Sequence, residues 1–79
     1  MTEDHKEITL DLSGLLCPLP VLKARKRLQS MAGGAVLHVI ATDPVAAIDM
    51  PHFCTEQGHE LLRQEKIGNA LHFKIKRAL

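Results

Sequence analysis

Hydrophobic and polar positions alternate in two stretches of the chain, residues 8–12 and residues 70–76. Successive side chains of a β-strand point to opposite faces of a sheet, so this alternation predicts two strands with one buried face each. The apolar members of both stretches are expected in the core: Ile8, Leu10, Leu12, Leu71, Phe73 and Ile75. Residues 35–42 are almost continuously apolar, which predicts a more central strand, and residues 60–66 form a fourth, polar strand.

Between the first two strands, apolar residues recur at helical spacing. Val21, Ala24, Leu28 and Met31 lie three or four residues apart, with charged residues between them. This spacing predicts an amphipathic helix that continues to Met31. We expect the glycine pair at residues 33–34 to stop it, because glycine readily adopts the conformation that ends a helix.

A second helical stretch is predicted after Asp43-Pro44. Aspartate is a favoured N-cap residue and proline is tolerated at the first helical position, so we expect Asp43 to cap this helix. Pro51 lacks a backbone N–H and should interrupt the stretch. We therefore expect two short helical pieces, the second running to Gln57 and ending at Gly58.

The predicted order of elements is βαβαββ. The first two strands should be parallel and joined by a right-handed crossover, and the last two should form a hairpin around Gly68-Asn69. The simplest packing is an α+β two-layer sandwich, in which a four-stranded mixed sheet carries both helices on one face. We expect residues 1–79 to form a single domain with an ordered core from about residue 8 to residue 77.

Composition narrows the classes of function. The net charge of +1, and the scarcity of aromatic residues at 3%, argue against direct binding of nucleic acid. No apolar run is long enough to span a bilayer, and the polar stretch from Met1 to Glu7 does not resemble an export signal. We therefore expect a cytoplasmic protein, without membrane contact, whose two cysteines are reduced.

The segment Cys17-Pro18-Leu19-Pro20 lies where the first helix is predicted to begin. If Pro18 and Pro20 occupy the first helical turn, Cys17 is the N-cap residue. A thiol at that position would face free N–H groups and the positive end of the helix dipole, both of which favour the nucleophilic thiolate. The sequence therefore indicates a reactive Cys17 with a lowered pKa.

The chain resembles the TusA/SirA-like sulfur-carrier family from about Ile8 to Lys76. The central likeness is Gly14-x-x-Cys17-Pro18-x-Pro20 followed by a basic helix. Further matching segments lie at residues 42–44, 49–54 and 58–61: Thr42-Asp43-Pro44, Asp49-Met50-Pro51-x-Phe53-Cys54 and Gly58-His59-Glu60-Leu61. Some members carry an acidic residue where this chain has Leu19, which we interpret as a difference in partner preference.

The resemblance implies a fold similar to the C-terminal domain of a bacterial translation initiation factor. It also implies that Cys17 is the catalytic residue, accepting a sulfane sulfur as a persulfide and handing it to an acceptor protein. Donors in the family include cysteine desulfurases and rhodanese-like proteins. Destinations include tRNA thiolation, molybdenum cofactor maturation and sulfur oxidation. If the protein is an enzyme, the resemblance makes it a sulfurtransferase-type persulfide carrier, and we expect a monomer without cofactors.

Other residues admit two interpretations. The basic residues of the first helix either dock acidic partner surfaces or form a solvated face: Lys23, Arg25, Lys26 and Arg27. Cys54 is either a resolving thiol or second sulfur site, or else a core residue beside Phe53, and we favour the core because free cysteine is often buried. The spacing of His52, Cys54 and His59 matches no zinc pattern, so we expect no metal.

The main alternative to a sulfur carrier is a non-catalytic interaction or regulatory module. Such a module would use the sheet face that the helices leave open. A binding module has no need of a thiol at a helix N-terminus, so Cys17 favours the carrier. A thiol-disulfide oxidoreductase is disfavoured because the chain has no Cys-x-x-Cys.

Overall fold

The computed structural model describes residues 7–79. Residues 1–6 lie outside the described residues, and they include His5 and most of the stretch that does not resemble an export signal. The elements, in chain order, are β1 (Glu7–Leu12), α1 (Leu19–Gln29), β2 (Val36–Ala41), α2 (Ala46–Gln57), β3 (Glu60–Ile67) and β4 (Ala70–Lys76). The predicted order βαβαββ is confirmed. Within residues 7–79, no helix has the length and apolar character that crossing a bilayer requires.

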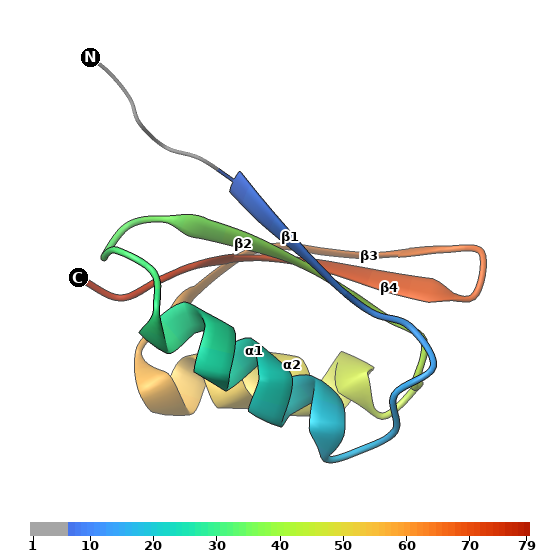
Figure 1. The fold of residues 1–79 in the computed structure, drawn as a ribbon. Helices are drawn as coiled ribbons and strands as arrows, with labels where there is room; N and C mark the ends of the chain where they lie inside the picture. Colours follow the sequence, from blue (N-terminus) through green and yellow to red (C-terminus); the bar gives the residue numbers. More distant parts are fainter. Residues whose placement is uncertain (1–6) are drawn as a thin grey trace.

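The four strands form one mixed sheet in the order β1-β2-β4-β3. β1 pairs in parallel with β2, whereas β4 pairs antiparallel with both β2 and β3. Figure 1 shows both helices packed against one face of the sheet while the other face carries no helix. The two-layer α+β architecture predicted from the sequence is therefore confirmed.

The core lies between the sheet and the two helices. The central strands β2 and β4 alternate buried and half-buried residues, as a sheet with one covered face requires. Each layer contributes apolar side chains that are almost fully buried: Leu37, Val39, Phe73 and Ile75 from the sheet, and Ala24, Leu28, Met50 and Cys54 from the helices. Val21 is only half-buried, although its spacing placed it on the core face.

The end of α1 differs from the prediction. The helix ends at Gln29 rather than at Met31, and Ser30 follows as the C-cap residue. The hydroxyl of Ser30 donates to the Arg27 carbonyl oxygen at 2.8 Å, and its backbone N–H bonds to the same oxygen at 3.1 Å. These two local bonds satisfy a carbonyl oxygen of the last helical turn, so the helix ends before the glycines at residues 33–34.

α2 is one continuous helix, so the prediction of two pieces was wrong. Pro51 cannot donate to the Ala47 carbonyl oxygen, which would be its partner in a regular helix. The side chain of Gln64, on β3, donates to that oxygen instead, at 3.1 Å. The carbonyl group therefore remains satisfied and the helix continues through the proline. The helix ends as predicted, with Gly58 in the left-handed conformation at φ +76°.

The start of α2 also differs from the prediction. The helix begins at Ala46, after a turn at Pro44 and Val45, so Asp43 is not its N-cap residue. Asp43 nevertheless organises this turn. Its Oδ1 accepts from the Val45 N–H at 3.1 Å, and its backbone carbonyl accepts from the Ala46 N–H at 3.0 Å.

Candidate functional site

Cys17 lies in a turn between β1 and α1, one residue before the position predicted from the prolines. The helix begins at Leu19 and Pro18 is its N-cap residue, so the prediction that Cys17 caps α1 was wrong. The carbonyl of Pro18 accepts the helical hydrogen bond from the Leu22 N–H, at 3.2 Å. Pro20 therefore occupies the second helical position. N–H groups in the first helical turn have no acceptor within the helix, so the missing N–H of Pro20 costs no intrahelical hydrogen bond.

The turn that carries the thiol is attached to the rest of the molecule at two points. Gly14 adopts φ +84°, a conformation that side chains with a Cβ rarely take, and its N–H donates to Thr42 Oγ1 at 2.8 Å. Asp43, buried to 7% exposure, accepts from the Cys17 N–H through Oδ2 at 2.6 Å. Since its other oxygen binds the Val45 N–H, one carboxylate joins the thiol-bearing turn to the start of α2.

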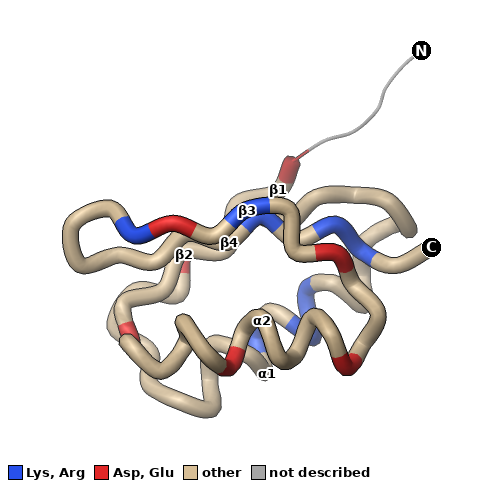
Figure 2. The backbone as a smooth tube through the Cα atoms, turned by 180° about the vertical axis from the view of Figure 1, so that it is seen from behind, with Lys and Arg blue, Asp and Glu red and all other residues tan. Residues whose placement is uncertain are grey.

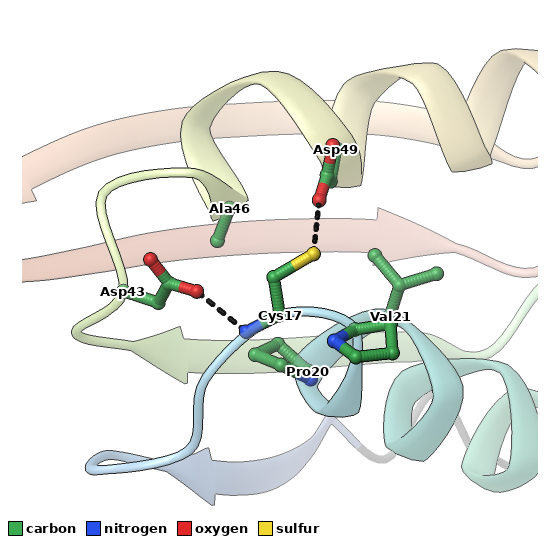
Figure 3. A pocket seen from close by; sticks show the side chains of 7 residues that line it. Cys17, Pro20, Val21, Asp43, Ala46 and Asp49 are labelled. Carbon is green, nitrogen blue, oxygen red and sulfur yellow. Dashed lines mark hydrogen bonds between the residues drawn. The ribbon is translucent and has the colours of Figure 1, made fainter.

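The thiol itself contacts a second carboxylate. Cys17 Sγ donates a hydrogen bond to Asp49 Oδ2 at 3.2 Å, and Figure 3 shows Asp49 on α2 above the sulfur. This bond raises the pKa of the Cys17 thiol, with smaller contributions from desolvation and from the charges of Asp49 and Asp43. Two nearby carboxylates disfavour a thiolate. The lowered pKa predicted from a helix-capping position was therefore wrong in direction.

Sequence reasoning missed Asp49 as a member of the site and gave Asp43 only a capping role. Asp49 lies 32 residues from Cys17 in the chain, and Asp43 lies 26 residues from it. Only the packing of α1 against α2 brings the three together. The one available signal was that both carboxylates belong to the segments that carry the family resemblance.

The immediate surroundings of Cys17 form a shallow hollow at the molecular surface. It is lined by residues of the two helices and of the turns that precede them: Cys17, Pro18, Pro20, Val21, Asp43, Ala46 and Asp49. It encloses no space that would admit a water molecule. Cys17 is exposed, and exposed apolar residues occur beside it in sequence, at Leu16 and Leu19, and near the start of α2, at Val45 and Ile48.

The four basic residues of α1 do not share one environment. Lys23, Arg25 and Lys26 are exposed, whereas Arg27 is half-buried and donates to Ser30 Oγ at 2.7 Å. Arg25 lines a groove of about 270 Å³ between the helices, in which Asp49 also participates. In Figure 2 the basic positions of α1 contrast with α2, whose charged side chains are acidic.

Cys54 is a buried core residue with 2% exposure. Its removal from water raises the pKa of the thiol to about 11. Both cysteines are free thiols. Across residues 7–79, no three His, Cys, Asp or Glu side chains are grouped in a way that could hold a metal ion. His52 pairs with Glu56 at 3.4 Å, and His59 Nδ1 accepts from the Ala78 N–H at 2.9 Å.

Known proteins resemble this chain over nearly its whole length. The family described as Sulfurtransferase TusA matches residues 8–77. The Sulfur carrier protein TusA of Allochromatium vinosum is 49% identical over 69 residues, which cover 87% of this chain and 91% of that protein. The protein of the same name from Pseudomonas entomophila is 47% identical over 79 residues, with 99% of each chain covered.

A solved structure extends the likeness to three dimensions. The crystal structure of the SirA-like protein from Desulfitobacterium hafniense superimposes with a TM-score of 0.77 at 25% identity, covering 91% of this chain and 99% of that one. The match to the family covers nearly all of the described sheet and both helices. The chain therefore belongs to the TusA family.

Proposed function

We propose that this protein is a sulfur carrier that holds a sulfane sulfur on Cys17 as a persulfide. The observation that carries the proposal is the exposed Cys17 thiol in a surface turn, where the sulfur of another protein can reach it. The other cysteine is buried and could exchange sulfur only after the core opened. The relatives named as sulfur carriers support the same assignment.

The transfer is a pair of displacement reactions. The Cys17 thiolate attacks the outer sulfur of a donor persulfide, a new S–S bond forms, the old one breaks, and the donor cysteine leaves as a thiolate. An acceptor thiolate then attacks the outer sulfur on Cys17, which leaves as a thiolate in turn. No net oxidation or reduction occurs, and each step needs the attacking sulfur deprotonated.

The site fits protein partners better than a small substrate. A cysteine desulfurase or rhodanese-like protein would supply the sulfur, and an acceptor in tRNA thiolation, molybdenum cofactor maturation or sulfur oxidation would take it. The exposed Lys23, Arg25 and Lys26 would favour acidic surfaces on these partners, whereas Arg27 is held by Ser30. We propose that the chain works in the cytoplasm as a single domain.

The test is sulfur loading of two single variants. Cys17→Ser should abolish loading by a cysteine desulfurase with labelled cysteine, since a hydroxyl forms no persulfide. It should leave the fold intact, because serine can still donate to Asp49. Cys54→Ser, the matched control, should load at close to the wild-type level. Labelled sulfur on Cys17→Ser at the wild-type level would show that the assignment to Cys17 is wrong.

The second candidate is an interaction module that uses the helix-free face of the sheet. That face has a hollow of about 280 Å³ with His38 and His72 in its lining, their ring nitrogens 2.9 Å apart. If the wild-type protein loads from neither a desulfurase nor a rhodanese donor, this candidate replaces the carrier.

A further inference from the structure

The carboxylate that contacts the Cys17 thiol has no cationic partner among residues 7–79. Asp49 accepts the thiol hydrogen at 3.2 Å, and among residues 7–79 it forms no ion pair with lysine, arginine or histidine. Arg25 and His52 line the same groove as Asp49, but His52 pairs with Glu56 instead. Asp43, which accepts from the Cys17 N–H, adds a second negative charge.

This arrangement works against the proposed reaction as long as the protein is alone. Sulfur transfer needs a thiolate, whereas the charges that face Cys17 most closely are both negative and favour the neutral thiol. They raise the pKa of the Cys17 thiol. A neutral thiol is also less open to oxidation and to exchange with stray disulfides, since both begin from the thiolate.

We propose that Asp49 is a positioning residue that keeps Cys17 as an oriented, protonated thiol until a partner protein pairs a cationic side chain with the Asp49 carboxylate. The inference rests on the proposed function and names one chemical property of the partner. Pairing would offset the nearest negative charge and compete for the oxygen that accepts the thiol hydrogen. Cys17 would then ionise at a lower pH, and its proton would pass to solvent or to the departing donor thiolate.

The charge distribution of the helices supports a cation from outside. α2 contains Asp49 and Glu56 and has no lysine or arginine, so the charges that this helix contributes are negative. The hollow at Cys17 itself has no room for a separate small ligand, but Asp49 also lines the open groove of about 270 Å³ between the helices. A lysine or arginine side chain of a docked partner could enter that groove and meet the Asp49 carboxylate, which forms no ion pair within residues 7–79.

The first experiment measures the rate of Cys17 alkylation by iodoacetamide against pH, in a Cys54→Ala background so that a single thiol reacts. Asp49→Asn should move the midpoint of the profile to lower pH and make alkylation several-fold faster at pH 7. Asp49→Glu, which restores the charge, should return the midpoint toward the wild-type value. Circular dichroism of each variant confirms that the fold is retained.

Glu56→Gln is the matched control. It removes the same charge from the same helix, about 10 Å further along its axis. Its alkylation profile should coincide with that of the parent. If Glu56→Gln shifts the midpoint as far as Asp49→Asn does, the effect is one of total charge and the proposal fails. An unchanged profile for Asp49→Asn also overturns it.

The second experiment tests recognition of a cation directly, with small disulfides as probes. The rate of exchange of Cys17 with cystamine, which carries two ammonium groups, is divided by the rate with the anionic dithiodiglycolate. The ratio should be several-fold lower in Asp49→Asn than in the parent protein, and unchanged in Glu56→Gln. Equal ratios in Asp49→Asn and the parent would contradict a cation-specific role.

These measurements use no donor protein, so they separate the two proposals. Failure of Cys17 to load from any donor would refute the carrier function while leaving the alkylation profiles to report on Asp49. Normal loading with identical alkylation profiles would leave the carrier function standing and refute the role of Asp49.

Discussion

Cys17 and Cys54 lie in the same helical layer in contrasting environments. Cys54 lies on α2 with 2% exposure, and its pKa is raised to about 11 because the thiolate would lose its hydration. Cys17 is exposed, and its pKa is raised mainly because Asp49 accepts its hydrogen. The pKa shift of Cys54 therefore follows from burial in the core, whereas that of Cys17 follows mainly from a hydrogen bond to one half-buried carboxylate.

The largest expected difference between the two thiols is kinetic. In the folded protein at neutral pH, iodoacetamide should label Cys17 at least about a hundredfold faster than Cys54, the factor expected if exposing Cys54 costs about 3 kcal/mol of local opening. Peptide mapping after brief labelling measures both rates in one sample. Labelling in denaturant is the control and should make the rates similar. Equal rates in the folded state would contradict the burial of Cys54.

The second expected difference concerns stability at high pH. The pKa of Cys54 is higher in the folded than in the unfolded protein. The stability that its neutral thiol contributes is therefore fully present below the pKa of the unfolded state, and it is lost as the pH rises toward about 11. The test compares Cys17→Ser with the double variant Cys17→Ser, Cys54→Ala. Between pH 8 and pH 11, the free energy of unfolding of the single variant should fall by up to about 2 kcal/mol more than that of the double variant.

Urea titrations at intervals of pH measure this difference. The sequence contains no tyrosine, whose side chain would titrate in this range. The lysines also titrate there, but they are common to both proteins. Parallel curves for the two proteins would show that Cys54 ionises as easily in the folded as in the unfolded chain.

The smallest expected effect concerns the support of the helix that carries both Asp49 and Cys54. Gln64→Leu should leave the Ala47 carbonyl without its donor and lower the free energy of unfolding by about 1 kcal/mol. Looser packing of α2 should also increase the labelling of Cys54. Gln29→Leu, at the exposed end of α1, is the matched control and should change neither quantity.

Much of the fold could be predicted because it depends on patterns within single segments. The alternation in residues 70–76 predicted the bounds of β4, and Gly58 predicted the end of α2. The path of α2 through Pro51 could not be predicted in the same way. It depends on a donor from Gln64, on another element 17 residues away, and no local pattern reveals such a bond.

The candidate site divides in a similar manner. The exposed Cys17 at the start of α1 follows from the proline spacing, with an error of one residue that proline preferences cannot resolve. The direction of its pKa shift was wrong because the helix end was the only influence visible from the neighbouring residues. The stronger influence is Asp49, which the packing of α1 against α2 brings to the sulfur.

The shallow hollow at Cys17 has a consequence for chemical probes of this protein. A reversible small-molecule inhibitor gains affinity by burying most of its surface in a pocket, and this hollow does not admit even a water molecule. Compounds that act at the thiol itself should therefore be electrophiles that bond to the sulfur. Their selectivity would come from the reactivity of the electrophile and from a cationic substituent that extends past Asp49 into the adjoining groove of about 270 Å³.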